Sequence, residues 1–165
     1  MSTAAHRKDA PASVRCLVLT ISDTRTSSND ASGDAIVSAL QAAGHVIARR
    51  QIVKDDPPAV SRAVQAGAVE VDVVITTGGT GIASRDGTYE ALSGIFDKKI
   101  DGFGELFRML SYDQVGSAAI MSRACAGTIG RTAVFALPGA EQAVRLAIDK
   151  LILPEIGHVV RELRR

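Results

Sequence analysis

The segment VVITTGGTGIASRDGT, residues 73–88, decides the fold class of this chain. Its first half is an apolar, β-branched run, which is typical of a strand buried on both faces of a sheet. The run ends directly on Gly78, Gly79 and Gly81, and the acidic residue Asp86 follows soon after. Glycines at a strand end permit tight turns and let backbone N–H groups approach a ligand closely. The segment therefore predicts a central strand that leads into a ligand-binding loop.

Strand and helix patterns alternate on both sides of this segment. Apolar runs predict strands at 14–22, 45–53, 71–77 and 132–137. Helices are expected from a cap at Ser32 to a stop at Gly44, after Asp56, over 88–96, over 103–110 and from Glu141 until Pro154 interrupts the run. Such alternation implies parallel pairing through right-handed crossovers. The expected fold class is α/β, a three-layer α/β/α sandwich with a mostly parallel sheet; segment 97–131 adds either short strands or a loop excursion.

Length and composition fit one globular domain. The chain has 165 residues and 17.2 kDa, enough for one sizeable core and too short for two ordinary domains. Residues 1–12 are small, polar and charged, and we expect them to form a flexible tail before a single domain over 13–165.

Several function classes are disfavoured. A net charge of +1, 4% aromatic residues and no Trp argue against a nucleic-acid partner. Cys16 and Cys125 lie far apart and outside any metal-binding spacing. No apolar run reaches the length of a membrane span, and the N-terminal stretch lacks the apolar core of a signal peptide, so no membrane contact and a cytoplasmic location are expected.

The glycine segment favours an anion ligand. Backbone N–H groups and the hydroxyls of Thr76, Thr77 and Thr80 are the donors that a phosphate accepts. The pattern is neither the dinucleotide fingerprint nor the P-loop, because it matches neither GxGxxG nor the GK[ST] ending. On the pattern alone, a tight strand-to-helix turn without a ligand is an equally good interpretation.

Two acidic residues favour a metal-assisted phosphate site. Asp86 follows the glycine loop, and Asp55 follows the preceding predicted strand, so both fall at the same edge of the sheet. Carboxylates beside a phosphate repel it unless they share a cation, and Mg²⁺ is the usual one. Asp56, directly before two prolines, is better explained as a helix cap.

Several motifs in order carry a family resemblance. TTGGTG, RDGTYEAL, GFGELFRMLSYDQVGSAAIMSRACAGTIGRT and LPGA together resemble the molybdenum cofactor biosynthesis family that includes MogA, MoaB and the G domain of gephyrin, with GFGELFRMLS closer to the MoaB branch. The resemblance runs from about Val14 to the last helix. It implies a three-layer molybdopterin-binding domain, assembled as a homo-oligomer, trimer or hexamer. It also implies adenylyl transfer from Mg·ATP to the terminal phosphate of molybdopterin, with release of pyrophosphate.

The resemblance also implies roles for individual residues. Asp55 and Asp86 match the essential acidic residues of the family, as catalytic residues and Mg²⁺ ligands. The implied contacts to phosphate, nucleotide or pterin are Thr76, Gly78, Gly79, Thr80, Gly81, Ser122, Arg123, Gly127, Thr128, Pro138 and Gly139, with Ser22, Asp23 and Ser32 in the same cleft.

One departure and two alternatives stay open at this point. Family members related to MogA continue the loop as D-V-T-P, whereas this chain has Gly87 after Asp86 and Tyr89 after Thr88. An adenylyltransferase is the favoured function, because a passive binder of an anionic pterin has no need of carboxylates beside its phosphate loop. A non-catalytic molybdopterin-binding protein is the main alternative, and an unrelated phosphate-binding scaffold is the weaker one.

Overall fold

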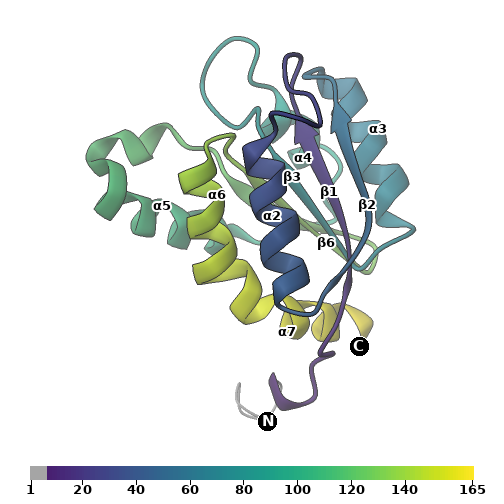
Figure 1. Ribbon diagram of the computed structural model, residues 1–165. Helices are drawn as coiled ribbons and strands as arrows, with labels where there is room; N and C mark the ends of the chain where they lie inside the picture. Colours follow the sequence, from purple (N-terminus) through teal and green to yellow (C-terminus); the bar gives the residue numbers. More distant parts are fainter. Residues whose placement is uncertain (1–6) are drawn as a thin grey trace.

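In the computed structural model, which describes residues 7–165, six strands form one sheet in the order β2-β1-β3-β6-β5-β4 (Figure 1). The strands are β1 (Arg15–Ile21), β2 (Val46–Val53), β3 (Val73–Thr77), β4 (Lys98–Lys99), β5 (Cys125–Ile129) and β6 (Thr132–Leu137). The pairs among β1, β2, β3 and β6 are parallel, whereas β5 runs antiparallel to β6 and to β4. The expected mostly parallel sheet is confirmed, and segment 97–131 supplies two short strands, of which β4 forms the edge of the sheet.

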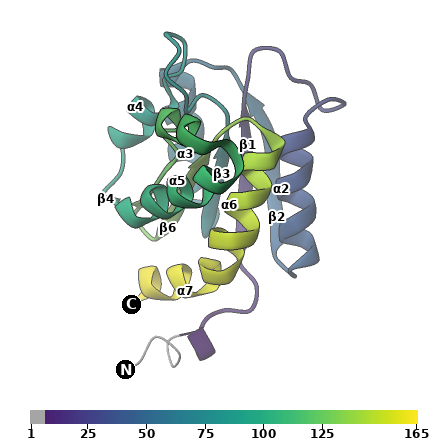
Figure 2. The same cartoon turned by 90° about the vertical axis from the view of Figure 1, so that its left-hand side faces the viewer.

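Helices cover both faces of the sheet and complete the three layers (Figures 1 and 2). They are α2 (Ala31–Ala42), α3 (Pro57–Ala68), α4 (Thr88–Ser93), α5 (Asp101–Val115), α6 (Glu141–Ala147) and α7 (Leu153–Arg164), with the 3₁₀ helix η1 (Gly116–Met121) and the π-helical turn η2 (Ile148–Ile152). Alternate residues of β1 enter two separate cores. Cys16 and Val18 pack with α2, α5, α6 and α7, and Leu17 and Leu19 pack with α3 and α4. This alternation is the period of two that a strand imposes on its side chains.

The caps of α2 and α3 show one wrong prediction and one confirmed prediction. Asp56 caps α3, since its carboxylate accepts from the Ala59 amide over 3.1 Å. Ser32 does not cap α2. Asp30 does, accepting from the Gly33 amide over 3.0 Å, so the cap lies two residues before the predicted one. The freed Ser32 hydroxyl donates to the Gly139 carbonyl over 2.7 Å.

The first described residues, 7–12, lie beside the last helix. The helical run from Glu141 is interrupted by the π-helical turn, and Pro154 stands in the first turn of α7. Residues 7–12 contact α7: Arg7 pairs with Glu155, and Arg161 lies 3.6 Å from Asp9. These six residues of the expected tail therefore pack on the domain, and residues 1–6 lie outside the described part of the chain. Within that described part, no helix is long and apolar enough to cross a membrane.

Candidate functional site

The loops that follow β1 and β3 meet at the carboxyl ends of the parallel strands, at the top of Figure 1. The sheet order places β1 between β2 and β3, so the chain leaves β1 and β3 in opposite directions across the sheet. Open α/β sheets bind ligands at such a switch point. The hollow found there is lined by Thr20, Ile21, Ser22, Arg25, Asp30, Ser32, Thr77, Gly78 and Gly139.

The glycine loop requires glycine at two successive positions. Gly78 has φ +107° and Gly79 has φ +72°, a region that side chains disfavour. A Cβ on Gly78 would also lie 2.4 Å from the Ile21 carbonyl oxygen. Thr88 fixes the turn from the other side, because its amide donates to the Gly79 carbonyl over 3.1 Å and its hydroxyl to the Gly78 carbonyl over 3.1 Å.

Several donors in this loop have no acceptor among the described residues. The Gly78 amide donates to the Leu137 carbonyl, whereas the amides of Gly79, Thr80 and Gly81 find no acceptor in that part of the chain. The buried Thr76 hydroxyl is likewise without a partner there. Polar groups held close to the interior without partners are uncommon and call for a ligand or solvent. Consecutive N–H groups of this kind suit an anion.

Two predicted acidic residues border the same loop. A Cβ on Gly79 would lie 3.3 Å from an oxygen of Asp55, and a Cβ on Gly81 would lie 2.7 Å from an oxygen of Asp86. The Asp55 side chain is only 7% exposed. Burial raises the pKa of Asp55 above its usual value; Arg85, at 3.8 Å, opposes this, and the charges of Asp23 and Asp86 add to it. The carboxylates of Asp23, Asp55 and Asp86 therefore repel one another beside the loop.

The donor set fits Mg²⁺ held jointly with a substrate. In the described part of the chain, no group of three or more His, Cys, Asp or Glu side chains could hold a metal ion by itself. Mg²⁺ is commonly bound by one or two carboxylates together with phosphate oxygens and water, so a complete protein cage is not needed. A cation beside Asp55 and Asp86 would also relieve their mutual repulsion.

Arg123 lies against the loop rather than free in the hollow. Its guanidinium donates to the carbonyls of Gly81 over 2.9 Å and Asp86 over 3.0 Å, and it pairs with the carboxylate of Glu90. It also stands 5.3 Å from the centre of the Tyr89 ring. The bond from Arg123 lowers the pKa of Glu90. The structure therefore places Arg123 as a clamp that holds the segment between the glycines and α4.

The remaining predicted residues fall into two groups. Ser122 and Pro138 line a second hollow between α5, η1 and α6. Gly127 and Thr128 lie within β5, away from the loop: Thr128 pairs with Ala133, which is level with Val73 at the start of β3. The end of β3 at Thr77 lies four residues beyond Val73. Thr128 is therefore about 13 Å, measured along the strands, from the start of the glycine loop. The structure does not bring these two residues to the glycine loop.

Sequence reasoning missed three residues of this region, Arg25, Arg85 and Asp30. Arg25 lines the hollow and donates to the Asn29 carbonyl, and Arg85 faces Asp55. Asp30 is buried, accepting from Thr20 over 2.6 Å and Arg50 over 2.9 Å. Loop arginines carry no periodic signal, and the partners of Asp30 come from other elements. An Asp before the first apolar turn was the available signal for Asp30.

The fold and this loop define an open α/β protein with a candidate anion site at its switch point. Residues 17–158 match the family described as a probable molybdopterin binding domain. The chain is 55% identical to molybdenum cofactor biosynthesis protein B of Bacillus cereus over 100% of this chain and 99% of that protein. The corresponding protein of Bacillus subtilis is 55% identical over the same shares.

Solved structures agree with the family. A crystal structure of molybdenum cofactor biosynthesis protein B superimposes with a TM-score of 0.92 at 55% identity, covering 95% of this chain and 99% of that one. A structure of MogA gives 0.82 at 28% identity, covering 90% of this chain and 99% of that one. The chain belongs to the molybdopterin-binding-domain family of molybdenum cofactor biosynthesis proteins.

Proposed function

We propose that the protein transfers the adenylyl group of ATP to the terminal phosphate of molybdopterin. A phosphate oxygen of molybdopterin attacks the α-phosphorus of ATP, the bond to the bridging oxygen breaks, and pyrophosphate leaves. The attacking group is already an anion, so the reaction needs little help from a protein base. What it needs is alignment of two anions that repel each other and neutralisation of their charge.

One observation carries the proposal: Asp55 and Asp86 border a loop in which the backbone N–H groups of residues 79–81 have no hydrogen-bond acceptor among the described residues. A site that only bound an anionic pterin would be weakened by two carboxylates at the phosphate loop. The same carboxylates are useful when they hold Mg²⁺ against a triphosphate. When bound there, Mg²⁺ would supply charge neutralisation on the phosphate oxygens.

The chain's own groups divide the remaining work. The amides of Gly79, Thr80 and Gly81 are the proposed donors to phosphate oxygens. The hollow with Ser22 and Gly139 is the proposed nucleotide side of the cleft. The second hollow, lined by Ser122 and Pro138, is the proposed pterin side. Arg123, which is fixed to the loop, acts here by holding Asp86 in place.

Single-turnover adenylylation tests the proposal. Wild-type protein, Asp55→Asn and Asp86→Asn are mixed with molybdopterin and Mg·ATP, and adenylyl-molybdopterin is quantified. We expect product with the wild type and at least about a hundredfold loss in both variants. Asp56→Asn is the matched control, because Asn also caps helices well and the residue is adjacent to Asp55. Tight binding of molybdopterin by the wild type without any adenylate would instead support the non-catalytic alternative.

We further propose that the protein assembles as a homo-oligomer, trimer or hexamer, through α5 and η1. These elements project from the sheet at the left of Figure 1 and carry most of the exposed large apolar side chains. They are Leu106, Met109, Tyr112, Val115, Ile120 and Met121, of which Ile120 is 83% exposed. Exposed large apolar side chains gathered on two adjoining elements are typical of an interface.

Light scattering tests this assembly. The wild type is expected to have three or six times the mass of one chain, and Met109→Lys with Ile120→Lys is expected to yield a smaller species. Val69→Lys is the control, because Val69 is 87% exposed but lies beyond α3 on the other side of the sheet. A wild-type monomer, or an oligomer unchanged by the double substitution, contradicts the proposed interface.

A further inference from the structure

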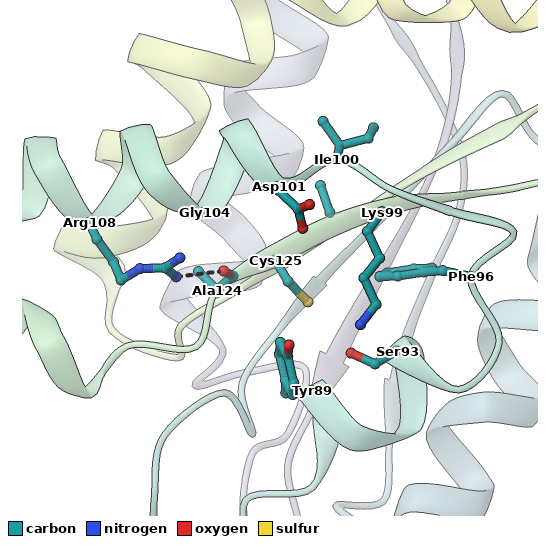
Figure 3. Close-up of a pocket in the computed structure, with 11 residues that line it drawn as sticks. Tyr89, Ser93, Phe96, Lys99, Ile100, Asp101, Gly104, Arg108, Ala124 and Cys125 are labelled. Carbon is teal, nitrogen blue, oxygen red and sulfur yellow. Dashed lines mark hydrogen bonds between the residues drawn. The ribbon is translucent and has the colours of Figure 1, made fainter.

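A third pocket lies apart from the glycine loop, between α4, β4, β5 and the start of α5 (Figure 3). It is lined by Tyr89, Ser93, Phe96, Lys99, Ile100, Asp101, Gly104, Arg108, Ala124, Cys125 and Ala126. Its cavity volume is about 80 Å³. One water needs only about 10–15 Å³, whereas pockets for drug-sized ligands measure about 300–1,000 Å³. The space therefore suits a small ion and excludes a nucleotide.

Three side chains point into this space from different elements. Figure 3 shows the Lys99 ammonium group and the hydroxyl of Ser93 directed toward each other, with the thiol of Cys125 beside them. The Ser93 hydroxyl oxygen is buried and has no hydrogen-bond partner among the described residues. The side chain of Lys99, a residue exposed to solvent, has no ion pair or hydrogen bond within that part of the chain either. A buried hydroxyl without a partner beside an unpaired cation indicates a missing acceptor.

Arg108 supplies a second cation in a fixed position. One nitrogen of its guanidinium donates to the carbonyls of Ala124 over 3.1 Å and Ser122 over 3.4 Å. Those bonds hold the plane of the group, and its other N–H groups have no acceptor among the described residues. A guanidinium held in this way is well suited to bind an oxyanion.

The charges around the pocket sum to positive. Lys99 and Arg108 face a single carboxylate, Asp101, which lies exposed at the first turn of α5. Burial raises the pKa of Cys125 to about 11, against the opposing charges of Lys99 and Arg108. The thiol is therefore neutral at physiological pH and adds no negative charge. The backbone N–H groups at the start of α5, which has no side-chain cap, add to the positive potential.

We propose that this pocket binds a small tetrahedral oxyanion, with inorganic phosphate and sulfate as its simplest members. Lys99 and Arg108 supply charge, and Ser93 and Cys125 supply donors. This site goes beyond the proposed adenylyl transfer and does not depend on it. It is connected to the glycine loop through Tyr89, whose ring lines the pocket and lies 5.3 Å from the Arg123 guanidinium.

Cys125 provides a built-in reporter. The chain has two cysteines, and Cys16 is fully buried, so a small thiol reagent should modify Cys125 first. Labelling is followed by mass spectrometry at pH 8.5 with increasing phosphate or sulfate, against chloride at equal ionic strength. We expect both oxyanions, and not chloride, to slow the labelling of Cys125 in a saturable way, without molybdopterin or ATP present. ATP is a separate arm, and protection by ATP but not by inorganic phosphate would overturn the proposal.

Two variants decide whether the pocket itself is responsible. Lys99→Met and Ser93→Ala should each weaken phosphate protection about tenfold, the cost of losing one hydrogen bond to a charged group. Lys98→Met is the matched control: Lys98 is the other residue of β4 but does not line the pocket, and it should leave protection unchanged. Circular dichroism checks that each variant is folded. Equal weakening by Lys98→Met would show that ordinary surface charge causes the protection. No protection in the wild type would show that the cavity holds only water. Either result would overturn the proposal.

Discussion

Arg123 and Asp86 are joined through the backbone: the guanidinium of Arg123 donates to the carbonyl oxygen of Asp86 over 3.0 Å. The same group reaches the Gly81 carbonyl and the Glu90 carboxylate, so one side chain fixes both ends of the segment between the glycines and α4. The carboxylate of Asp86 accepts from the Ala83 amide over 2.9 Å within that segment. The position of the proposed Mg²⁺ ligand thus depends on a residue 37 positions away in sequence.

Arg123→Lys should distinguish two roles of this side chain: its hydrogen bonds to the loop and its positive charge. Lysine keeps the positive charge but cannot reach two carbonyls and a carboxylate at once. We expect adenylylation to fall about 10- to 100-fold, because Asp86 loses its fixed position. Single-turnover rates measure the effect. Arg145→Lys, in an exposed ion pair on α6, is the control and should change nothing. A wild-type rate in Arg123→Lys contradicts the positioning role.

Gly78→Ala should damage folding as well as the site. A side chain at φ +107° is strained, and its Cβ would overlap the Ile21 carbonyl oxygen at 2.4 Å. We expect a loss of about 3 kcal/mol or more in the free energy of unfolding, measured with urea. Gly102→Ala is the control: nothing lies within 4 Å of its Cβ in α5, so alanine should be neutral or stabilising by up to about 1 kcal/mol. Similar losses in both variants would contradict this account.

Asp55→Asn should stabilise the protein while removing its activity. Because burial and neighbouring carboxylates raise the pKa of Asp55, its ionised form is unfavourable in the folded state. The variant should therefore melt about 1–3 °C higher at pH 7. That gain should vanish as the pH falls below about 3.9, where the carboxyl is protonated in both states. Calorimetry at pH 7 and at pH 3 tests the sign of this effect, and a lower melting temperature at pH 7 would contradict it.

Asp30→Asn should have the opposite pH dependence. Burial opposes ionisation of Asp30, but bonds from Thr20 and Arg50 hold its pKa below the usual value. Its contribution to stability is therefore present above about pH 4 and is lost as the pH falls through the folded-state pKa. We expect Asp30→Asn to lower the free energy of unfolding by about 2 kcal/mol at pH 7. The difference from wild type should shrink toward pH 3.

Asp34→Asn is the control for that measurement. Asp34 also pairs with Arg50, but its side chain is 59% exposed. Exposed pairs contribute about 0–1 kcal/mol, so its substitution should have a small effect at every pH. If the two variants behave alike, the buried network around Asp30 is not a source of stability.

Local sequence determined the elements and the loop. Apolar runs predicted β1, β3 and β6 within about two residues, because a strand covered on both faces must be apolar throughout its length. The edge strand β2 was also predicted, although most of its residues are exposed or half-buried. The glycines fixed the turn, since only glycine adopts those dihedral angles without strain. Asp56 as a cap was predictable because a cap bonds to an amide three residues away.

The tertiary structure alone decided which side chains meet. The sequence around Arg123 does not predict its contact with Asp86, and the sequence around Thr128 does not predict that it lies four strand residues from the end of β3. The antiparallel turn of β5 back along β6 carries Gly127 and Thr128 away from the glycine loop. The pocket of Lys99, Ser93 and Cys125 is likewise assembled from three elements. Backbone propensities act over a few residues, whereas charge pairing and cavity shape depend on the packing of the whole sheet.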